Sequence, residues 1–285
     1  MSDLVQQQNT VCDFATSDSW VILSPIEQSI KRKIEAVGTP LKDWDINIYR
    51  GVLTGCNEAF IIDSHKRDEI LANCQTEDER KRTEELIRPI LRGRDIKRYG
   101  YEDNGLYLIN THNGIRGRIP RIKIEDYPAV KAHLDRYWDK IANRADQGDT
   151  PYNLRNCAYL EDFNKPKILW KRVGSILRFG YNSNSALGLD STCFATGQNI
   201  EFLCCLLNSP MGHYLLKDSP KTGTGDLLIS VQAVEPIRVP LISDKDNDLF
   251  TLNMSETQEK WINRKIFELY HLSSLEISYI NENFS

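Results

Sequence analysis

Hydrophobic and polar residues recur at helical spacing near both ends of the chain and in several internal stretches. Ile26, Ile30 and Ile34 fall on one face of a helix, and Ser24 and Glu27 fit a capping box at its start. The same reasoning predicts helices over residues 76–91, 126–144, 200–207, 211–217 and 256–272, and a short one through 280 after Ser273. Within 126–144, the side chains expected to point inward are Val130, Leu134, Tyr137, Trp138 and Ile141.

Other stretches alternate hydrophobic and polar residues, which is typical of short β-strands. These are residues 46–50, 58–63, 106–110, 167–173, 176–179, 186–189, 193–196 and 234–239, with a turn over 51–57. Because helices and strands follow no regular βαβ order, we predict a mixed, irregular α+β fold of the α/β class, with flanking helices. We assign residues 1–243 to one domain, leaving open a further division near 145–155. Residues 244–285 form a C-terminal helical tail that opens on a polar hinge.

The composition indicates a folded protein. Of the 285 residues, 40% are hydrophobic and 27% are charged, both near globular averages. No apolar run approaches the ~20 residues of a membrane span, so we expect no membrane partner. The polar N-terminus lacks the apolar stretch of a signal peptide. Seven cysteines without a CxxC pair favour reduced thiols and a cytoplasmic location over a disulfide scaffold or a zinc module.

The charge distribution is more informative than the net charge of −4. Residues 80–123 carry twelve Lys or Arg against five Asp or Glu, and residues 163–178 carry five against none. The rest of the chain is acidic. Two basic segments of this kind are typical of a polyanion-binding surface. Local pairing on a helix accounts better for Arg80, Lys81 and Arg82, which have five acidic neighbours.

Complete catalytic motifs are missing from the sequence. All prolines are isolated, so no Pro-Pro loop of an amino-methyltransferase is present, and the Gly-rich stretch from Lys221 to Asp226 lacks P-loop spacing. The histidines are scattered and form no i, i+4 ligand pair. We therefore predict no catalytic residues, no metal site and no cofactor within this chain. We expect Trp170 and at least one of Cys204 and Cys205 in the core.

A series of short motifs stands in order along about four-fifths of the chain. They are LKDW at 41–44, YRGVLTGCNEAFII at 49–62, PILRGRDIKRY at 89–99, FNKPKILW at 163–170, LLNS at 206–209 and FELYHLS at 267–273. This series resembles the TaqI-type C-terminal specificity domain. That family forms the target-recognition part of adenine-specific DNA methyltransferases and of fused type II restriction–modification enzymes. His271 stands where the family usually has Gly.

The resemblance implies a function for the chain. It implies a domain that recognises double-stranded DNA and positions it for an N-terminal methyltransferase domain or subunit outside this sequence. That catalytic part would flip an adenine out of the duplex and methylate its amine. It would use S-adenosylmethionine, with Mg²⁺ as a second candidate cofactor of the parent protein.

Candidate DNA-binding residues come from the basic segments and the motifs. Arg and Lys near Gly suit phosphate contacts, whereas base reading needs Arg, Lys, Asn or Gln at groove edges. The phosphate candidates are Arg92, Arg94, Lys97, Arg98 and Lys221, and the base or groove candidates are Arg50, Thr54, Asn57, Arg116, Arg118, Lys171, Arg172 and Arg178. For Thr54 and Asn57, a turn whose glycines set the backbone geometry is an equal interpretation.

Two other functions remain open at this stage. The acidic ends and the C-terminal helices also suit a protein-interaction module of a restriction–modification complex. A standalone Mg²⁺-dependent nuclease would use Glu161, Asp162 and Lys167, with Lys165 nearby.

Overall fold

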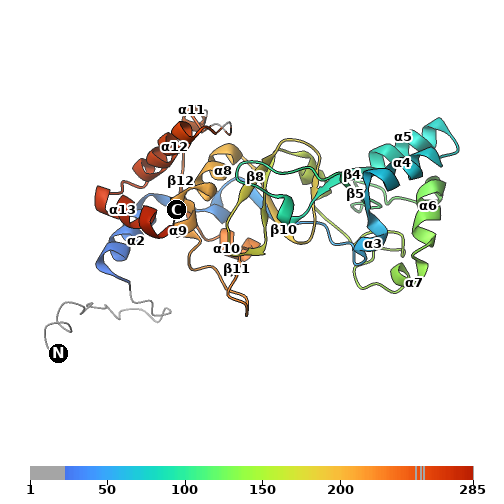
Figure 1. Cartoon of the computed structure of the whole chain (residues 1–285), viewed down its shortest axis with the longest axis horizontal. Helices are drawn as coiled ribbons and strands as arrows, with labels where there is room; N and C mark the ends of the chain where they lie inside the picture. Colours follow the sequence, from blue (N-terminus) through green and yellow to red (C-terminus); the bar gives the residue numbers. More distant parts are fainter. Residues whose placement is uncertain (1–22, 248, 251, 253, 285) are drawn as a thin grey trace.

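The computed structural model describes residues 23–247, 249, 250, 252 and 254–284. The molecule is elongated (Figure 1), with a group of helices at one end, a β-sheet in the middle and a second group of helices and strands at the other end. No helix in this described part of the chain is both long and apolar enough to cross a membrane.

The central sheet has four antiparallel strands in the order β2-β10-β6-β8. These strands are Ile46–Arg50, Thr192–Gly197, Lys167–Lys171 and Phe179–Asn182. Side chains alternate between the two faces, as the period of a strand requires. Ile168 and Trp170 join one hydrophobic cluster, whereas Leu169 and Phe194 join the other. Both faces of the sheet are therefore buried.

Helices complete the hydrophobic cluster on the first face of this sheet. They are α2 (Pro25–Val37), α8 (Ile200–Asn208), α9 (Pro210–Leu215), α12 (Glu256–Leu269) and α13 (Ser274–Phe284). Ile262 and Ile280 of the last two are fully buried in the same cluster as Ile30 of α2. A short pair, β1 (Gly38–Pro40) with β12 (Arg238–Pro240), and two one-turn helices, α10 (Val231–Val234) and α11 (Asp244–Asn247), complete this end. The domain boundary at 244 and the division near 145–155 remain predictions.

The other end of the molecule is built by residues between β2 and β6. It contains α3 (Asn57–Phe60), β3 (Ile61–Asp63), α4 (Ser64–Ala72), α5 (Glu77–Leu86), β4 (Ile87–Leu91), β5 (Leu106–Ile109), α6 (Pro128–Asp135) and α7 (Trp138–Ile141). We call residues 57–164 the inserted lobe. Its strands form a second sheet in the order β3-β5-β4-β9, in which β9 (Leu187–Gly188) returns from the central region and runs parallel to β4.

The predicted fold class is confirmed, since short strands and flanking helices alternate irregularly. The capping box of Ser24 and Glu27 is present, and Trp170, Cys204 and Cys205 are buried as expected. The helix predicted over 76–91 was too long, because residues 87–91 leave it as β4, which pairs with β5 through residues 87–89 and with β9 through residues 90–91.

Several other predicted boundaries of helices, strands and turns also differ from the structure. Residues 57–60 are helical and residues 61–63 form β3, so 51–57 links two sheets and closes no hairpin. The helix predicted over 126–144 is broken between α6 and α7, which leaves Trp138 44% exposed. Residues 231–234 form α10 before the closing strand, and residues 244–247, predicted as a hinge, form a helical turn.

Candidate nucleic-acid interface

Three of the predicted cations meet at one shallow depression in the middle of the molecule. We call it the basic depression; it has a volume of about 230 Å³ and is lined by Gly93, Arg94, Ile96, Lys171, Gly174, Ser175, Ile176 and Arg178. Arg94, Lys171 and Arg178 are exposed, and no carboxylate lines the depression. None of the three forms an ion pair with any residue that the structure describes. Their charge is therefore available to an anion from solvent.

Arg94 is presented by the short 3-10 helix η2 (Gly93–Asp95), which Asp95 holds in place. Asp95 is only 2% exposed. Its carboxylate accepts one hydrogen bond from the Arg92 backbone N–H at 2.8 Å and two from the Arg92 guanidinium, each at 2.9 Å. Asn104 donates a fourth at 3.0 Å. Burial acts to raise the pKa of Asp95, but these bonds outweigh it and hold the pKa below its ordinary value. Asp95 therefore stays ionised and η2 stays fixed.

Gly93 allows η2 to lie directly on β6. A Cβ atom at Gly93 would come within 2.7 Å of Lys171 Cγ, so a larger residue would push the loop away from the strand. Lys171 ends β6 on the same face as Leu169, toward η2. Arg172, one residue later, belongs to the opposite face: its backbone carbonyl accepts a hydrogen bond from Ile229, and its Nε is buried. Lys171 and Arg172 were both predicted as groove contacts, but their side chains lie on opposite faces and therefore do not belong to one surface.

Lys221 lies in a neighbouring loop. The two-residue strand β7 (Val173–Gly174) borders the basic depression and pairs with β11 (Leu227–Leu228). The loop before β11 begins with an isolated bridge between Lys221 and Leu227 and projects at the bottom of Figure 1. Lys221 is exposed and has no ion pair in the described part of the chain. It could extend the basic depression across β7.

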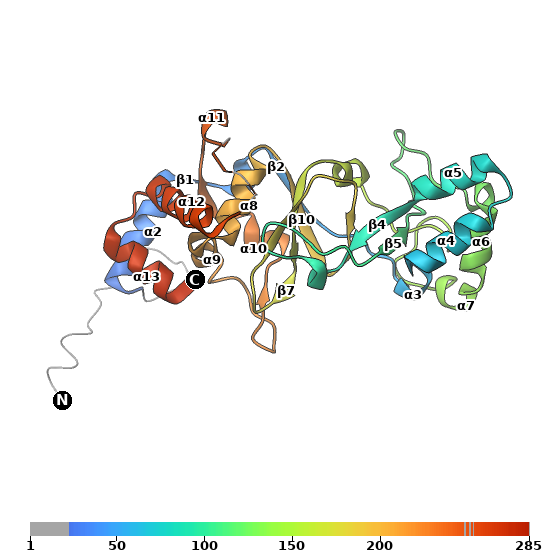
Figure 2. The same cartoon turned by 45° about the horizontal axis from the view of Figure 1, so that its top comes forward.

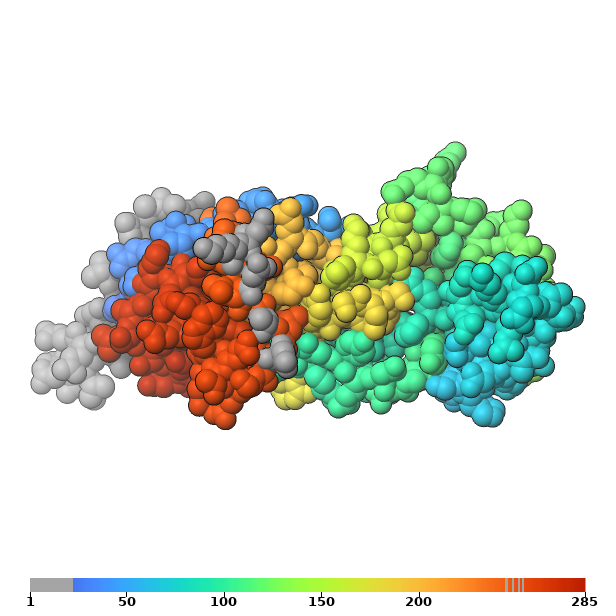
Figure 3. All heavy atoms as spheres, turned by 90° about the horizontal axis from the view of Figure 1, so that it is seen from above, coloured from blue at the N-terminus to red at the C-terminus, as the bar shows by residue number. Residues whose placement is uncertain are grey.

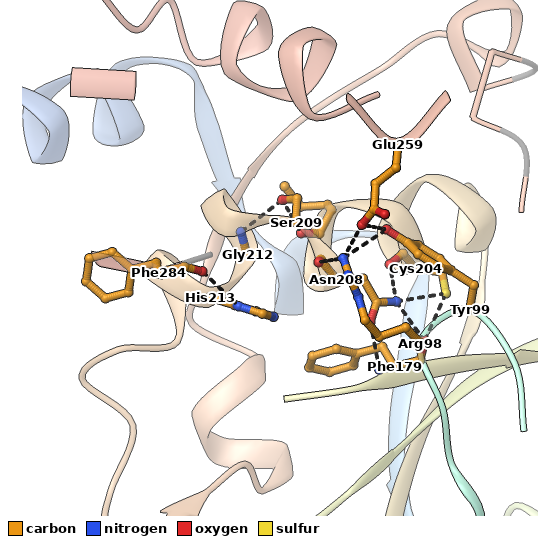
Figure 4. Close-up of polar contacts among 11 residues, drawn as sticks. Arg98, Tyr99, Phe179, Cys204, Asn208, Ser209, Gly212, His213, Glu259 and Phe284 are labelled. Carbon is orange, nitrogen blue, oxygen red and sulfur yellow. Dashed lines mark hydrogen bonds and ion pairs between the residues drawn. The ribbon is translucent and has the colours of Figure 1, made fainter. Parts of the chain in front are cut away.

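The other three phosphate candidates have acidic partners. Arg92 is bound to Asp95, and Lys97 Nζ lies 3.1 Å from the Glu102 carboxylate. Arg98 pairs with Glu259 of α12 and donates to the Asn208 carbonyl at 2.8 Å (Figure 4). These contacts give Arg92 and Arg98 structural roles.

Asn208 extends the contact of Arg98 into the core. Its side chain accepts a hydrogen bond from the Phe179 N–H at 3.0 Å and donates to the Phe179 carbonyl at 2.7 Å (Figure 4). Arg98 thus ties the segment after η2 to α8, to α12 and, through Asn208, to the start of β8.

Arg116 and Arg118 lie in a loop that stands out from the inserted lobe (Figures 2 and 3). Residues 113–121 and 156–158, with Asp149, line a depression of about 780 Å³ there, separate from the basic depression. Arg116 is exposed and unpaired among the described residues, whereas Arg118 pairs with Glu161 and Arg121 lies 3.2 Å from Asp149. The second surface is therefore partly neutralised.

Thr54 and Asn57 form a turn. Thr54 is 2% exposed, and its hydroxyl donates to Asn57 Oδ1 at 2.6 Å, while Gly55 between them has a φ of 66°. The Thr54 hydroxyl is therefore used within the turn, which agrees with the turn interpretation, and a groove contact by Thr54 stays a prediction. Asn57 is exposed at the start of α3.

Arg50, the remaining groove candidate, lines a third depression, and its Nε donates a hydrogen bond to the Asp190 carbonyl at 3.4 Å.

The nuclease interpretation finds no support in the geometry. Glu161 pairs with Arg118, and Asp162 with Lys165 at 2.6 Å. Lys167 is fully buried and donates to the carbonyls of Phe163 and Asn184 and to Asn182 Oδ1. Burial, reinforced by the charge of Arg88, lowers the pKa of Lys167 to about 7. No group of three or more possible metal ligands occurs among the described residues.

Sequence reasoning does not identify Asp95, which supports the basic depression from below, or Ile176, which lines it. For Asp95 the available signal is its spacing of three from Arg92, which is that of a local ion pair. Ile176 was assigned to a strand, whereas it is 65% exposed in the connection between β7 and β8. The sequence signal for a functional role of Ile176 is the presence of cations on both sides of it, Lys171 and Arg172 before it and Arg178 after it.

Comparisons with known proteins add a relationship at the level of the fold. No family model and no curated protein matches the sequence. Among solved structures, the type IIL restriction–modification enzyme MmeI in complex with DNA is similar with a TM-score of 0.59 and 10% identity, over 87% of this chain and 36% of that chain. The type IIG restriction endonuclease BpuSI is similar with a TM-score of 0.49 and 12% identity, over 91% of this chain and 32% of that chain.

This chain thus spans about a third of the length of each of these enzymes. Its fold is related to part of the restriction–modification enzyme MmeI.

Proposed function

We propose that this chain binds duplex DNA and that the basic depression contacts its phosphate backbone. The observation that carries the proposal is the convergence of Arg94, Lys171 and Arg178 on one surface without a carboxylate. Two of these side chains are arginines, whose planar guanidinium groups bind phosphate oxygens in a bidentate manner. The overall charge of −4 does not oppose this role, because the field near a surface follows the local charges.

The finer proposal is a sequence-specific recognition domain of a type II restriction–modification enzyme or of an adenine-N6 DNA methyltransferase. The ordered motifs that resemble the TaqI-type specificity domain support it, as does the related fold within MmeI, an enzyme whose structure was determined with DNA. In this proposal, catalysis and S-adenosylmethionine belong to a methyltransferase domain or subunit outside this sequence. The chain positions the duplex for that partner.

The test is duplex binding at about 50 and 200 mM salt. We expect Arg94→Ala, Lys171→Ala and Arg178→Ala each to weaken binding to all sequences by about 1 kcal/mol. Each loses about one phosphate contact, so the slope of log affinity against log salt falls by about 1. Fluorescence anisotropy with a labelled pool of random duplexes measures both quantities.

Arg32→Ala is the matched control. Arg32 is exposed on α2, at the far end of the molecule, and has no ion pair among the described residues. This variant should keep the wild-type affinity and salt slope. Absence of duplex binding by the folded wild-type protein at low salt, or equal effects of Arg32→Ala and Arg94→Ala, would contradict the proposal.

A further inference from the structure

An exposed isoleucine stands among the cations of the basic depression. Ile176 is 65% exposed, and it lines the depression together with Arg94, Lys171 and Arg178. The other large apolar side chains with substantial exposure in the described part of the chain are Trp138, Leu241, Leu249, Trp261 and Leu275, and none of them lines this surface. Ile176 therefore adds little to the core, and its position suggests a contact with a ligand.

The chemistry of a duplex groove matches this arrangement. Phosphates form the two rims of a groove, and the bases form its floor. Cations around an apolar side chain suit such a surface, because the cations meet the rims while the apolar group reaches the floor. Phosphate oxygens offer nothing to an isoleucine, whereas thymine methyl groups and the faces of unstacked bases are apolar.

The backbone around Ile176 suits a projecting contact. Ile176 lies between the end of β7 at Gly174 and the start of β8 at Phe179. Phe179 is fully buried, its N–H and carbonyl are bonded to Asn208, and β7 is paired with β11. The short connection is thus anchored at both ends, so that its exposed side chain is held at the surface.

We propose that Ile176 enters a groove of the bound duplex and contacts the bases, which makes it a specificity-determining residue. This inference rests on the proposed function and deepens it: the cations of the basic depression supply affinity for any duplex, and Ile176 supplies preference among sequences.

The experiment selects sequences from a randomised duplex pool with the wild-type protein and with Ile176→Ala. We expect the variant to lose the wild-type preference at one or more positions and to bind the best wild-type site at least about tenfold more weakly. Its affinity for random duplex and its salt slope should stay within about twofold, because no charge is removed. Arg94→Ala should show the reverse pattern, with weaker binding and an unchanged preference.

Leu275→Ala is the matched control, because Leu275 is 78% exposed on α13, away from this surface. It should leave preference and affinity unchanged, and a thermal melt of each variant checks the fold. Two further readouts identify the kind of contact. A loss of affinity on replacing thymine by uracil, seen with wild type and not with Ile176→Ala, assigns a methyl contact. A rise in 2-aminopurine fluorescence that depends on Ile176 assigns insertion between base pairs. Either supports the inference.

Three outcomes are decisive and separable. If Ile176→Ala selects the wild-type motif with wild-type affinity, the inference is overturned and the proposed function stands. If wild type binds duplex in a salt-dependent way without selecting any motif, there is no base reading for Ile176 to supply. The inference and the finer proposal of sequence-specific recognition then both fail, and only the proposal of duplex binding stands. If wild type binds no duplex, the proposed function itself fails.

Discussion

At the scale of single residues, the buried carboxylate of Asp95 determines where a cation stands. Asp95 carries no charge to the basic depression, yet it binds the backbone and the guanidinium of Arg92 and so fixes η2 beneath Arg94. Two arginines two positions apart thus have different tasks. Arg92 holds the loop, and Arg94 is left free for a ligand.

We expect Asp95→Asn to weaken duplex binding about as much as Arg94→Ala does, although it removes a negative charge. The neutral amide loses charge-assisted bonds worth about 1.5–3 kcal/mol each, and η2 no longer holds Arg94 in position. Anisotropy titrations on both variants test this. Asp139→Asn is the control, because Asp139 is exposed on α7 without an ion pair in the described chain. Stronger binding by Asp95→Asn would instead show that only the local charge matters.

At the scale of elements, an ion pair between Lys33 and Glu276 joins α2 to α13. Glu276 is 3% exposed; it binds Lys33 Nζ at 2.6 Å and accepts from the Ser273 backbone N–H at 2.6 Å. Burial acts to raise the pKa of Glu276, but the bonds from Lys33 and Ser273 outweigh it and lower the pKa to about 2. Glu276 therefore binds both the predicted capping residue Ser273 and Lys33, and so connects α13 to α2, which is far away in the sequence.

The pH dependence of this contact follows from the direction of the shift. A carboxyl with a lowered pKa in the folded state stabilises the protein above its ordinary pKa, near 4.5, and loses that contribution as the pH falls toward 2. We expect Glu276→Gln to reduce the free energy of unfolding by about 1–3 kcal/mol at pH 7 and by much less near pH 2. Urea unfolding at both pH values measures the difference. A cost that does not change with pH would exclude this explanation.

At the scale of the whole molecule, the central sheet separates two hydrophobic clusters and contributes side chains to both. Phe194 of β10 is fully buried on the face of the inserted lobe, where its ring lies 4.5 Å from that of Phe163 and 5.3 Å from that of Tyr49. Its neighbours Cys193 and Ala195 face the other cluster. Loss of packing on one face must therefore disturb the strands that carry the other.

We expect Phe194→Ala to reduce the free energy of unfolding by about 3–5 kcal/mol while the protein still unfolds in one transition. Circular dichroism reports on all helices. Fluorescence reports on the tryptophans, which include Trp170 of the central sheet, Trp261 of α12 and Trp138 of the inserted lobe. Both signals should shift to the same lower urea midpoint. Two separate transitions would show that the clusters fold independently.

The sequence predicted what depends on neighbours along the chain. The capping box at Ser24 and the burial of Trp170 follow from local patterns, and both are confirmed. Pairing over long distances could not be predicted. Residues 87–91 continue a helical pattern but pair with β5 and β9, and Glu259 neutralises Arg98 from 161 positions away. Of the candidate cations, those left without acidic partners could be identified only once the chain was folded.

The inserted lobe leaves and re-enters the same sheet at neighbouring places. The chain departs at the end of β2 and returns at the start of β6, and these two parallel strands flank β10 on either side. Arg50 pairs with Cys193 and Lys167 with Thr196, so the two crossing points are two strand spacings apart across the sheet and three residues apart along β10, roughly 14 Å in all. A segment joined in this way can be exchanged between related genes by recombination at two sites, without changing the path of the remaining chain. The exchanged segment must still pack on Leu169 and Phe194, pair with β9 and keep the contacts of Arg98 with α8 and α12. Variation in this part of the molecule is therefore free in its outer loops and constrained at this inner surface.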